Sequence, residues 1–388
     1  MRREAHLENS PKGVSVNASE TVDSSRRVLF LYKQTSLRAE ALAAGGSASF
    51  TLYGLPELAE EGWPLEAVFG QSDTGIRGIA GALLRRWNHW EIGYSANPRA
   101  VLPHFGKLRG AIGIVATSNN VGLPLLQLKR RRLVTAPVFL LSVGLEAYRS
   151  DADSPRRRRL SRLLRYAEKI LVFSQTEKQF LVERLDLRSG KVAAVPYGFA
   201  PRYFPAFREE RPLLKEIFTV GADAQRDMEL LREWSLQHPE TRIRAILSRE
   251  IVERLPAVPD SWVLENDVPL ETVLARLAEA SLVVIPVKEN LYTAGTTFLL
   301  QALAAGVPTL VARTGALPAM PEAEPFPFLT YEPGNPASFA DGMQRLLALG
   351  PEERRQRSRD GRRWAERWGD GRELRRELEN FVERCTEA

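Results

Sequence analysis

The sequence predicts an α/β protein built from two doubly wound domains, each a parallel sheet covered by helices on both faces. Three observations support this prediction. Short apolar runs alternate with helical patterns, a segment rich in Pro and aromatic residues interrupts the alternation near mid-chain, and the alternation then restarts. With 388 residues, the chain is long enough for two domains that each have a hydrophobic core.

The first half contains five short apolar runs that we interpret as buried strands. They are "RVLFLY" (27–32), "AIGIVA" (111–116), "PVFLLS" (137–142), "KILVF" (169–173) and "KVAAV" (191–195). Helical patterns over 55–61 and 176–185 lie between them, so the runs alternate with helices as in a parallel sheet.

The segment "PYGFAPRYFPAFREERP" (196–212) follows neither period and is interpreted as an interdomain linker. The predicted strands after it are 216–220, 242–247, 262–264, 282–286 and 308–312, with helices over 227–237 and 270–280 and further helices from Asn335 onward. The expected units are a disordered leader (1–25), an amino-terminal domain (26–205), a carboxy-terminal domain (206–365) and a last helix (366–388) that packs back on the first domain.

Composition limits the class of protein and its compartment. The chain is 44% hydrophobic and 26% charged, and no apolar run approaches the ~20 residues of a spanning helix. The single cysteine, Cys385, excludes an internal disulfide framework. We therefore expect a cytoplasmic protein. The four histidines are scattered without ligand spacing, so we expect no metal ion.

The net charge of +6 is divided unevenly. Residues 1–210 hold 31 Lys and Arg against 20 Asp and Glu, whereas residues 211–388 hold 23 against 28. Part of the excess lies in a predicted amphipathic helix that begins with Arg156–Arg159. Such a helix can lie on an anionic membrane surface, or it can be a solvated helix whose apolar stripe joins the domain core. No aromatic residues interleave the arginine clusters, which argues against nucleic acid as a partner.

The segment "LVVIPVKENLYTAGTTFLLQALAAGVPTLVA" (282–312) predicts a strand, a loop, a helix and a second strand. Ala294, Gly295, Thr296 and Thr297 then lie on the first turn of the helix, at the carboxyl edge of the sheet. Backbone N–H groups there have no intrahelical partner and the helix dipole is positive, which suits a phosphate. A plain capped helix start explains the same residues without a ligand.

This segment resembles the donor-binding signature of the two-Rossmann-domain (GT-B) glycosyltransferases, in particular the large retaining family four. "QALAAGVP" matches the second half of the signature, "VPYGFAPRYF" the interdomain segment, and "FTVGADAQRDMELLREW" and "VPLETVLARLAEASLVVIP" the start and the base-contacting turn of the donor domain. The resemblance is strong over 216–345 and weak before 110. It implies a GT-B fold and the transfer of a sugar from a nucleotide-diphosphate sugar, with retention of configuration and without a metal or other cofactor.

The resemblance also implies roles for individual residues. Gly221, Val268, Thr293, Ala294, Gly295, Thr296, Thr297 and Gln301 would bind the donor, and Arg226 and Lys288 would stabilise the departing diphosphate. The family's two Glu positions hold Thr293 and Gln301, so the carboxylate pair is absent here.

The acceptor side is less well defined by the sequence. Asn119, Asn120, Ser142 and Gly144 follow predicted strands of the amino-terminal domain, where they could contact sugar hydroxyls, although loop formation explains them equally well. The expected acceptor is a carbohydrate, a lipid-linked glycan or a small molecule. Two alternatives to an enzyme remain open: a catalytically silent GT-B relative that binds nucleotide or glycan or acts as a scaffold, and a polyanion or membrane-surface binder.

Overall fold

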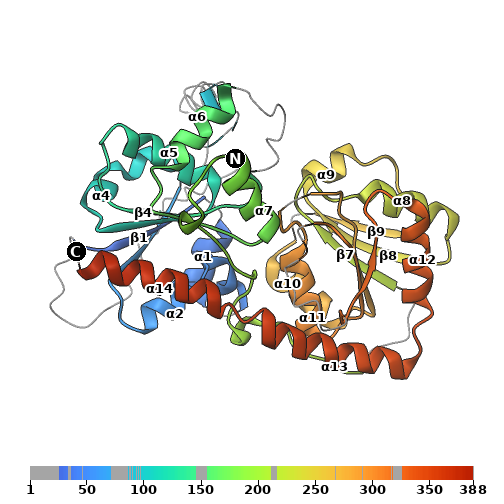
Figure 1. Cartoon of the computed structure of the whole chain (residues 1–388). Helices are drawn as coiled ribbons and strands as arrows, with labels where there is room; N and C mark the ends of the chain where they lie inside the picture. The colour runs from blue at the N-terminus through green and yellow to red at the C-terminus, as the bar shows by residue number, and fades with distance from the viewer. Residues whose placement is uncertain are drawn as a thin grey trace, which may run out of the picture.

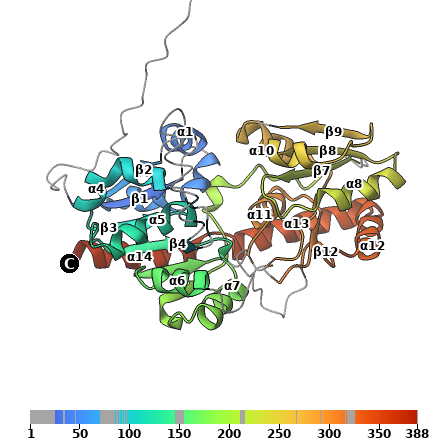
Figure 2. The same cartoon turned by 90° about the horizontal axis from the view of Figure 1, so that it is seen from above.

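The computed structural model describes residues 26–33, 36–45, 47–70, 86, 89, 91, 92, 94, 96, 98–145, 155–210, 216–266, 268–290, 292–315, 317 and 326–387. The predicted leader over 1–25 lies outside these residues. Figures 1 and 2 show two lobes, each with a sheet between layers of helices. Both sheets have six strands, and every strand pairing within them is parallel. The predicted fold class is confirmed.

The amino-terminal sheet has the strand order β2-β1-β3-β4-β5-β6. Its strands are β1 (Val28–Tyr32), β2 (Leu65–Phe69), β3 (Gly113–Ala116), β4 (Val138–Leu141), β5 (Lys169–Val172) and β6 (Val192–Ala194). The described helices of this lobe are α1 (Ser36–Ala44), α2 (Leu55–Glu60), α4 (Phe105–Gly110), α5 (Asn119–Arg130), α6 (Pro155–Leu164) and α7 (Gln175–Gln179), which continues as a π-helical turn over Phe180–Arg184.

The carboxy-terminal sheet has the order β12-β11-β10-β7-β8-β9. Its strands are β7 (Glu216–Gly221), β8 (Arg242–Leu247), β9 (Trp262–Glu265), β10 (Leu282–Ile285), β11 (Thr309–Ala312) and β12 (Leu329–Tyr331). Its helices are α8 (Met228–Gln237), α9 (Arg249–Arg254), α10 (Leu270–Glu279), α11 (Thr296–Ala305), α12 (Pro336–Leu347) and α13 (Pro351–Trp368), and α14 (Arg372–Glu387) ends the chain.

All ten strands expected from apolar runs are present, and β2 and β12 are the two that the sequence reading missed. Both are edge strands. β2 carries Glu66 and is only partly buried, and β12 has three residues, so neither forms an apolar run of the kind that identifies a central strand.

The chain crosses between the domains twice, and the two crossings lie against each other. Phe199 donates its N–H to the Gly369 carbonyl at 3.0 Å. A Cβ at Gly198 would lie 2.6 Å from that same oxygen, so this approach requires glycine. Beyond the second crossing, α14 packs on the amino-terminal domain, where Leu374, Leu378 and Phe381 join the core formed by β1. Figure 1 shows α13 along one lobe and α14 along the other.

The apolar stripe of α6 is part of the domain core. Leu160, Leu163 and Leu164 are buried with the residues of β3 and β4. These leucines are therefore not available for insertion into lipid, and any contact of α6 with a membrane would be electrostatic.

Candidate functional site

The predicted donor elbow lies at the point where the strand order of the second sheet reverses. β7 and β10 are neighbours although they are not consecutive, and the chain builds outward to β9 on one side and to β12 on the other. Ligands of open α/β sheets bind outside the carboxyl ends of the strands at such a point. The loops after β7 and β10 both reach this edge, and α11 begins there.

These two loops are joined by backbone hydrogen bonds. Asp227 donates its N–H to the Pro286 carbonyl at 3.1 Å, and Lys288 donates to the Gln225 carbonyl at 2.8 Å. The N–H of Val287 is bound by the phenol oxygen of Tyr331 at 3.3 Å, and burial raises the pKa of that phenol. The backbone around the elbow is therefore held by the loop after β7 and by a side chain of β12.

Gly295 caps α11 in a conformation that other residues rarely adopt. Its φ is +82°, and a Cβ there would lie 2.9 Å from Ile285 Cγ2 and 3.0 Å from Arg226 Nη1. The absence of a side chain lets the guanidinium approach the first turn of the helix. Positive charge from Arg226 and from the helix dipole thus meets at one place.

The guanidinium of Arg226 is held but not fully satisfied. Its side chain is 7% exposed, and Nε donates to Asp223 Oδ2 at 3.2 Å. A Cβ at Gly221 would lie 2.8 Å from Arg226 Cγ, so Gly221 makes room for the side chain. No described residue accepts a hydrogen bond from Nη1. A buried cationic donor without an acceptor, beside a helix N-terminus, is an arrangement that suits an anion.

The other residues predicted to bind the donor lie along the same segment or beside it. Thr293 accepts the N–H of Thr296 at 3.2 Å, which closes the turn around Ala294. Thr296 and Gln301 are buried, and Gln301 lies one helical turn after Thr297 on the same face. Val268 lies apart from them, between β9 and α10, where it packs against the core of its domain.

Lys288 differs from Arg226 in its surroundings. Its backbone belongs to the paired loops, but its side chain is exposed. The described contacts include no hydrogen bond or ion pair between its ammonium group and the elbow. The structure therefore brings Arg226 to the helix N-terminus and does not bring the Lys288 side chain there.

Tyr197, in the first interdomain crossing, contacts the elbow from the other side. Its hydroxyl faces the hydroxyl of Thr297, and burial raises the pKa of the phenol. Its ring packs edge-on against Phe173 at 5.2 Å and against Phe199 at 6.3 Å between ring centres. The first turn of α11 is thus tied to the segment that links the domains.

The residues predicted to bind the acceptor gather at the carboxyl ends of β3 and β4. Asn119 and Asn120 begin α5, and Ser142 directly follows β4. Asn119 donates through Nδ2 to the Val143 carbonyl at 2.7 Å, which connects the two strand ends. Gly144 has a φ of +78° and lies against the ring of Tyr292. A Cβ on Gly144 would lie 3.5 Å from Cδ1 of that ring.

The two domains meet at this edge through two further contacts. Thr176 Oγ1, at the start of α7, donates to the Gly315 carbonyl at 2.5 Å, and Gly315 donates its N–H to Glu289 at 3.1 Å. Glu289 belongs to the loop between β10 and α11, as does Tyr292. The acceptor-side and donor-side residues therefore lie on facing parts of the two domains.

Sequence reasoning missed the contact roles of Tyr197, Tyr292 and Glu177. Tyr197 lies in the predicted linker, which follows neither period, and Tyr292 lies in a loop without a period. Glu177 is 1% exposed and binds the N–H of Gly144 at 3.0 Å. A capping pattern, Ser174 followed by Glu177, was the available signal, because Ser174 Oγ accepts the Glu177 N–H at 3.3 Å.

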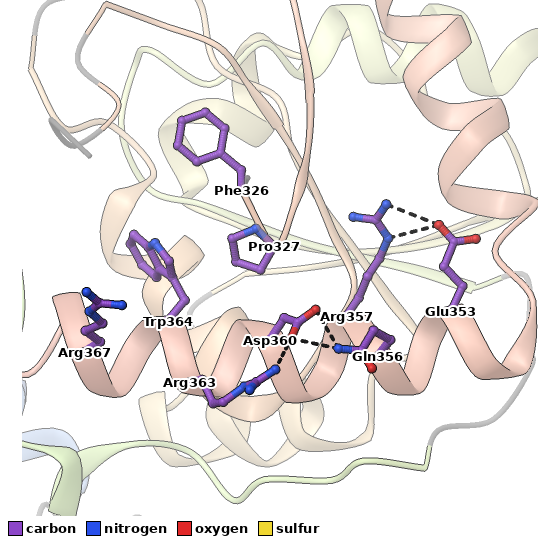
Figure 3. A pocket seen from close by; sticks show the side chains of 9 residues that line it. All are labelled: Phe326, Pro327, Glu353, Gln356, Arg357, Asp360, Arg363, Trp364 and Arg367. Atoms are coloured by element: carbon purple, nitrogen blue, oxygen red, sulfur yellow. Dashed lines mark hydrogen bonds and ion pairs between the residues drawn. The ribbon is translucent and has the colours of Figure 1, made fainter. Parts of the chain in front are cut away.

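Other parts of the described structure offer no competing constellation with this chemistry. Among the residues described, no three His, Cys, Asp or Glu side chains are grouped so that they could hold a metal ion. A pocket of about 530 Å³ lies against α13, but its Arg357 pairs with Glu353 and its Arg363 with Asp360 (Figure 3). Phe326 and Pro327 line it just before β12, so it lies toward the amino edge of the sheet, opposite α11's first turn.

We predict that the facing hydroxyls of Tyr197 and Thr297 form a hydrogen bond that couples the linker to α11. We expect Tyr197→Phe and Thr297→Val each to lower the free energy of unfolding by about 1 kcal/mol, the net contribution of one such bond. The double variant should lose less than the sum, because both changes remove the same bond. Urea unfolding followed by tryptophan fluorescence measures these differences.

Tyr203→Phe provides the matched control, since the Tyr203 hydroxyl binds Arg202 at 2.8 Å and not α11. Its effect should add to that of Thr297→Val. Additive losses for Tyr197→Phe and Thr297→Val would show that the two hydroxyls are not coupled.

No protein-family profile matches the sequence, and no curated protein sequence is significantly similar to it. Solved structures are similar in fold. HepE from Anabaena superposes with a TM-score of 0.61 at 13% identity, over 92% of this chain and 99% of HepE. A trehalose 6-phosphate synthase from Burkholderia multivorans gives 0.60 at 13% identity, over 93% and 99%. A glycosyltransferase from Rickettsia africae gives 0.57 at 10% identity, over 93% and 98%. The chain therefore has the two-domain GT-B fold of these proteins.

Proposed function

We propose that the protein is a glycosyltransferase that moves a sugar from a nucleotide-diphosphate sugar to a hydroxylated acceptor. The observation that carries this proposal is the unpartnered Arg226 Nη1 beside the first turn of α11, at the switch point of the sheet. HepE, which has the same fold, was crystallised with UDP and glucose and with UDP-glucose. A uridine diphosphate sugar is therefore the first donor to test.

In the proposed donor site, different residues bind the different parts of the nucleotide sugar. Arg226 and the backbone N–H groups of Gly295 to Thr297 bind the diphosphate, the Gln301 amide binds a ribose hydroxyl, and Val268 contacts the base. As the bond to the sugar breaks, negative charge grows on the departing diphosphate. Arg226 and the helix N-terminus are already oriented toward that charge, so they need little rearrangement to stabilise it.

The finer features of the reaction rest on the resemblance to family four. We propose that configuration is retained and that a departing phosphate oxygen takes the proton of the acceptor hydroxyl, without a metal ion or other cofactor. Asn119, Asn120, Ser142 and Gly144 bind the acceptor, which is a carbohydrate, a lipid-linked glycan or a small molecule. The protein works in the cytoplasm.

A catalytically silent relative is the second candidate. The observation that favours it is that Thr293 and Gln301 replace the two carboxylates of the family signature. Such a relative would bind the nucleotide without turning it over, so binding and turnover of the donor must be measured separately.

The test of the proposed site compares wild-type protein with Arg226→Ala. We expect the release of UDP from UDP-glucose to fall about 10²–10³-fold, as when one donor to a developing charge is removed, with a smaller loss of UDP affinity. Because the Lys288 side chain is exposed, Lys288→Ala should have the smaller effect of the two.

Arg242→Ala serves as the control, because Arg242 is an exposed arginine at the amino end of β8, on the opposite edge of the sheet. Wild-type turnover in Arg226→Ala would show that Arg226 does not stabilise the departing diphosphate. UDP binding by the wild type without hydrolysis or transfer would support the silent relative instead.

We further propose that the basic surface of α6 holds the protein on anionic membranes. Arg157 donates to the Arg184 carbonyl and Arg159 to the Glu91 carbonyl, whereas Arg156 and Arg158 are exposed, as is Arg162. Only the exposed arginines can face lipid head groups, and each contributes about 1 kcal/mol near such a surface. No described helix is long and apolar enough to cross a bilayer.

Changing Arg156, Arg158 and Arg162 to Gln should release the protein from phosphatidylserine vesicles at low salt, in a co-sedimentation assay. The matched control changes three exposed arginines of the carboxy-terminal half to Gln and so removes the same amount of positive charge. They are Arg254, Arg345 and Arg363. Wild-type protein that ignores anionic vesicles even at low salt would contradict membrane association.

A further inference from the structure

Three polar side-chain atoms at the carboxyl ends of β3 and β4 have no hydrogen-bond partner among the residues that the structure describes. They are Ser118 Oγ, Asn119 Oδ1 and Ser142 Oγ, and all three are buried. Asn119 is 2% exposed and Ser142 is fully buried. Buried polar groups in folded proteins are almost always paired, so three unpaired atoms in neighbouring loops call for a ligand or a structural reason.

The three atoms lie at the start of α5 and directly after β4. Ser118 is the N-cap residue, yet its side chain makes no capping bond, and Asn119 is the first residue of this 12-residue helix. Val138 and Leu140 of β4 pack in the same core as α5, so Ser142 continues the side of the strand that faces the helix. The first sheet reverses its strand order between β1 and β3, so Ser118 and Asn119 follow a strand that flanks this switch point, and Ser142 follows the next strand of the sheet.

The helix is held closely against the sheet at this end. A Cβ at Gly122 would lie 2.3 Å from Leu140 Cδ1 and 3.4 Å from Ala116 Cβ, so a larger residue would require the Leu140 side chain to move. The start of α5 therefore cannot settle further onto the strand ends to satisfy the three atoms.

The backbone around Ser142 is already satisfied. Ser142 donates its N–H to the Leu171 carbonyl at 2.8 Å, and the Val143 carbonyl binds Asn119 Nδ2. The N–H groups of Gly144 and Leu145 both bind the carboxylate of Glu177, at 3.0 and 3.4 Å. Asn119 and Glu177 thus fix the backbone of this loop by hydrogen bonds. The unpaired atoms belong to side chains carried by this fixed backbone.

The chemistry of this set defines its ligand. Each serine hydroxyl can donate or accept, and the helix N-terminus offers N–H donors. Asn119 Oδ1 can only accept, as any amide oxygen does, and the bond from Nδ2 to Val143 fixes the orientation of the amide. A phosphate accepts only, so it would face this oxygen without a bond, close to the buried Glu177 carboxylate. A sugar hydroxyl accepts from the helix and donates to Asn119.

We propose that Ser118, Asn119 and Ser142 bind neighbouring hydroxyls of an uncharged sugar, which makes the acceptor a neutral carbohydrate and not a phosphorylated one. This inference rests on the proposed function and specifies its acceptor. The loop that carries Ser142 also presents Gly144 to Tyr292, in the loop that leads to α11. The sugar would enter when the domains separate at this contact, and it would then lie beside the donor loop.

The test measures sugar binding by saturation-transfer NMR to protein saturated with UDP. The probes are glucose, galactose, mannose and N-acetylglucosamine, each paired with its 6-phosphate. At least one neutral sugar should bind ten or more times more tightly than its phosphate. Ser142→Ala should lower the affinity for that sugar about five- to tenfold, which is the effect of one hydrogen bond, and should leave the affinity for UDP unchanged.

Ser142→Ala should not lower the melting temperature, because it removes a buried hydroxyl that has no partner. Ser118→Ala provides a second variant with the same expectation for sugar binding. The matched control is Thr241→Val, which removes a buried unpartnered hydroxyl beyond α8 and should leave sugar binding unchanged.

Equal or tighter binding of the 6-phosphates overturns the inference, and so does unchanged sugar affinity in both serine variants or binding of no sugar to the UDP-loaded protein. Failure of the wild type to bind UDP would contradict the proposed function instead. The sugar titrations are therefore repeated without nucleotide, where the same order of affinities is expected.

Discussion

The candidate site depends on the approach of the Arg226 guanidinium to Gly295. This contact places a cation against the positive end of α11, and it exists because neither Gly221 nor Gly295 has a side chain in the way. Asp223 pairs with the Nε side of the guanidinium, and the unpartnered Nη1 beside the positive end of the helix favours a bound anion. The paired loops after β7 and β10 maintain this arrangement, since their backbones are bonded to each other on both sides of Arg226.

The links between the domains converge on the same region. The Tyr197 hydroxyl, in the first crossing, faces that of Thr297, Tyr292 faces Gly144, and Thr176 donates a hydrogen bond to Gly315. In addition, α14 returns to the core of the first domain. A change in the relative position of the domains must therefore alter contacts of the elbow itself. In the proposed enzyme this gives the protein a means to couple closure to donor binding.

The sequence predicted the fold well because its central strands are buried on both faces, and such strands appear as continuous apolar runs. The edge strands β2 and β12 were not predicted, because β2 is partly exposed and β12 has only three residues. The elbow was found because Gly295 and the threonines mark a helix start after a strand. The position of Lys288 in sequence, by contrast, did not reveal that its side chain is exposed while that of Arg226 is buried. Contacts across the domains, such as those of Tyr197 and Glu177, depend on how distant segments pack and leave no local pattern.

The central claim is that the first turn of α11, with Arg226, binds a diphosphate. Backbone amide NMR of ¹⁵N-labelled protein tests it most directly, with UDP and uridine titrated in parallel. If the diphosphate binds there, saturating UDP shifts the amide signals of Gly295, Thr296 and Thr297, and uridine at the same concentration leaves them nearly unchanged. Shifts of equal size with uridine, or no shift at these three amides when UDP is bound, would contradict it.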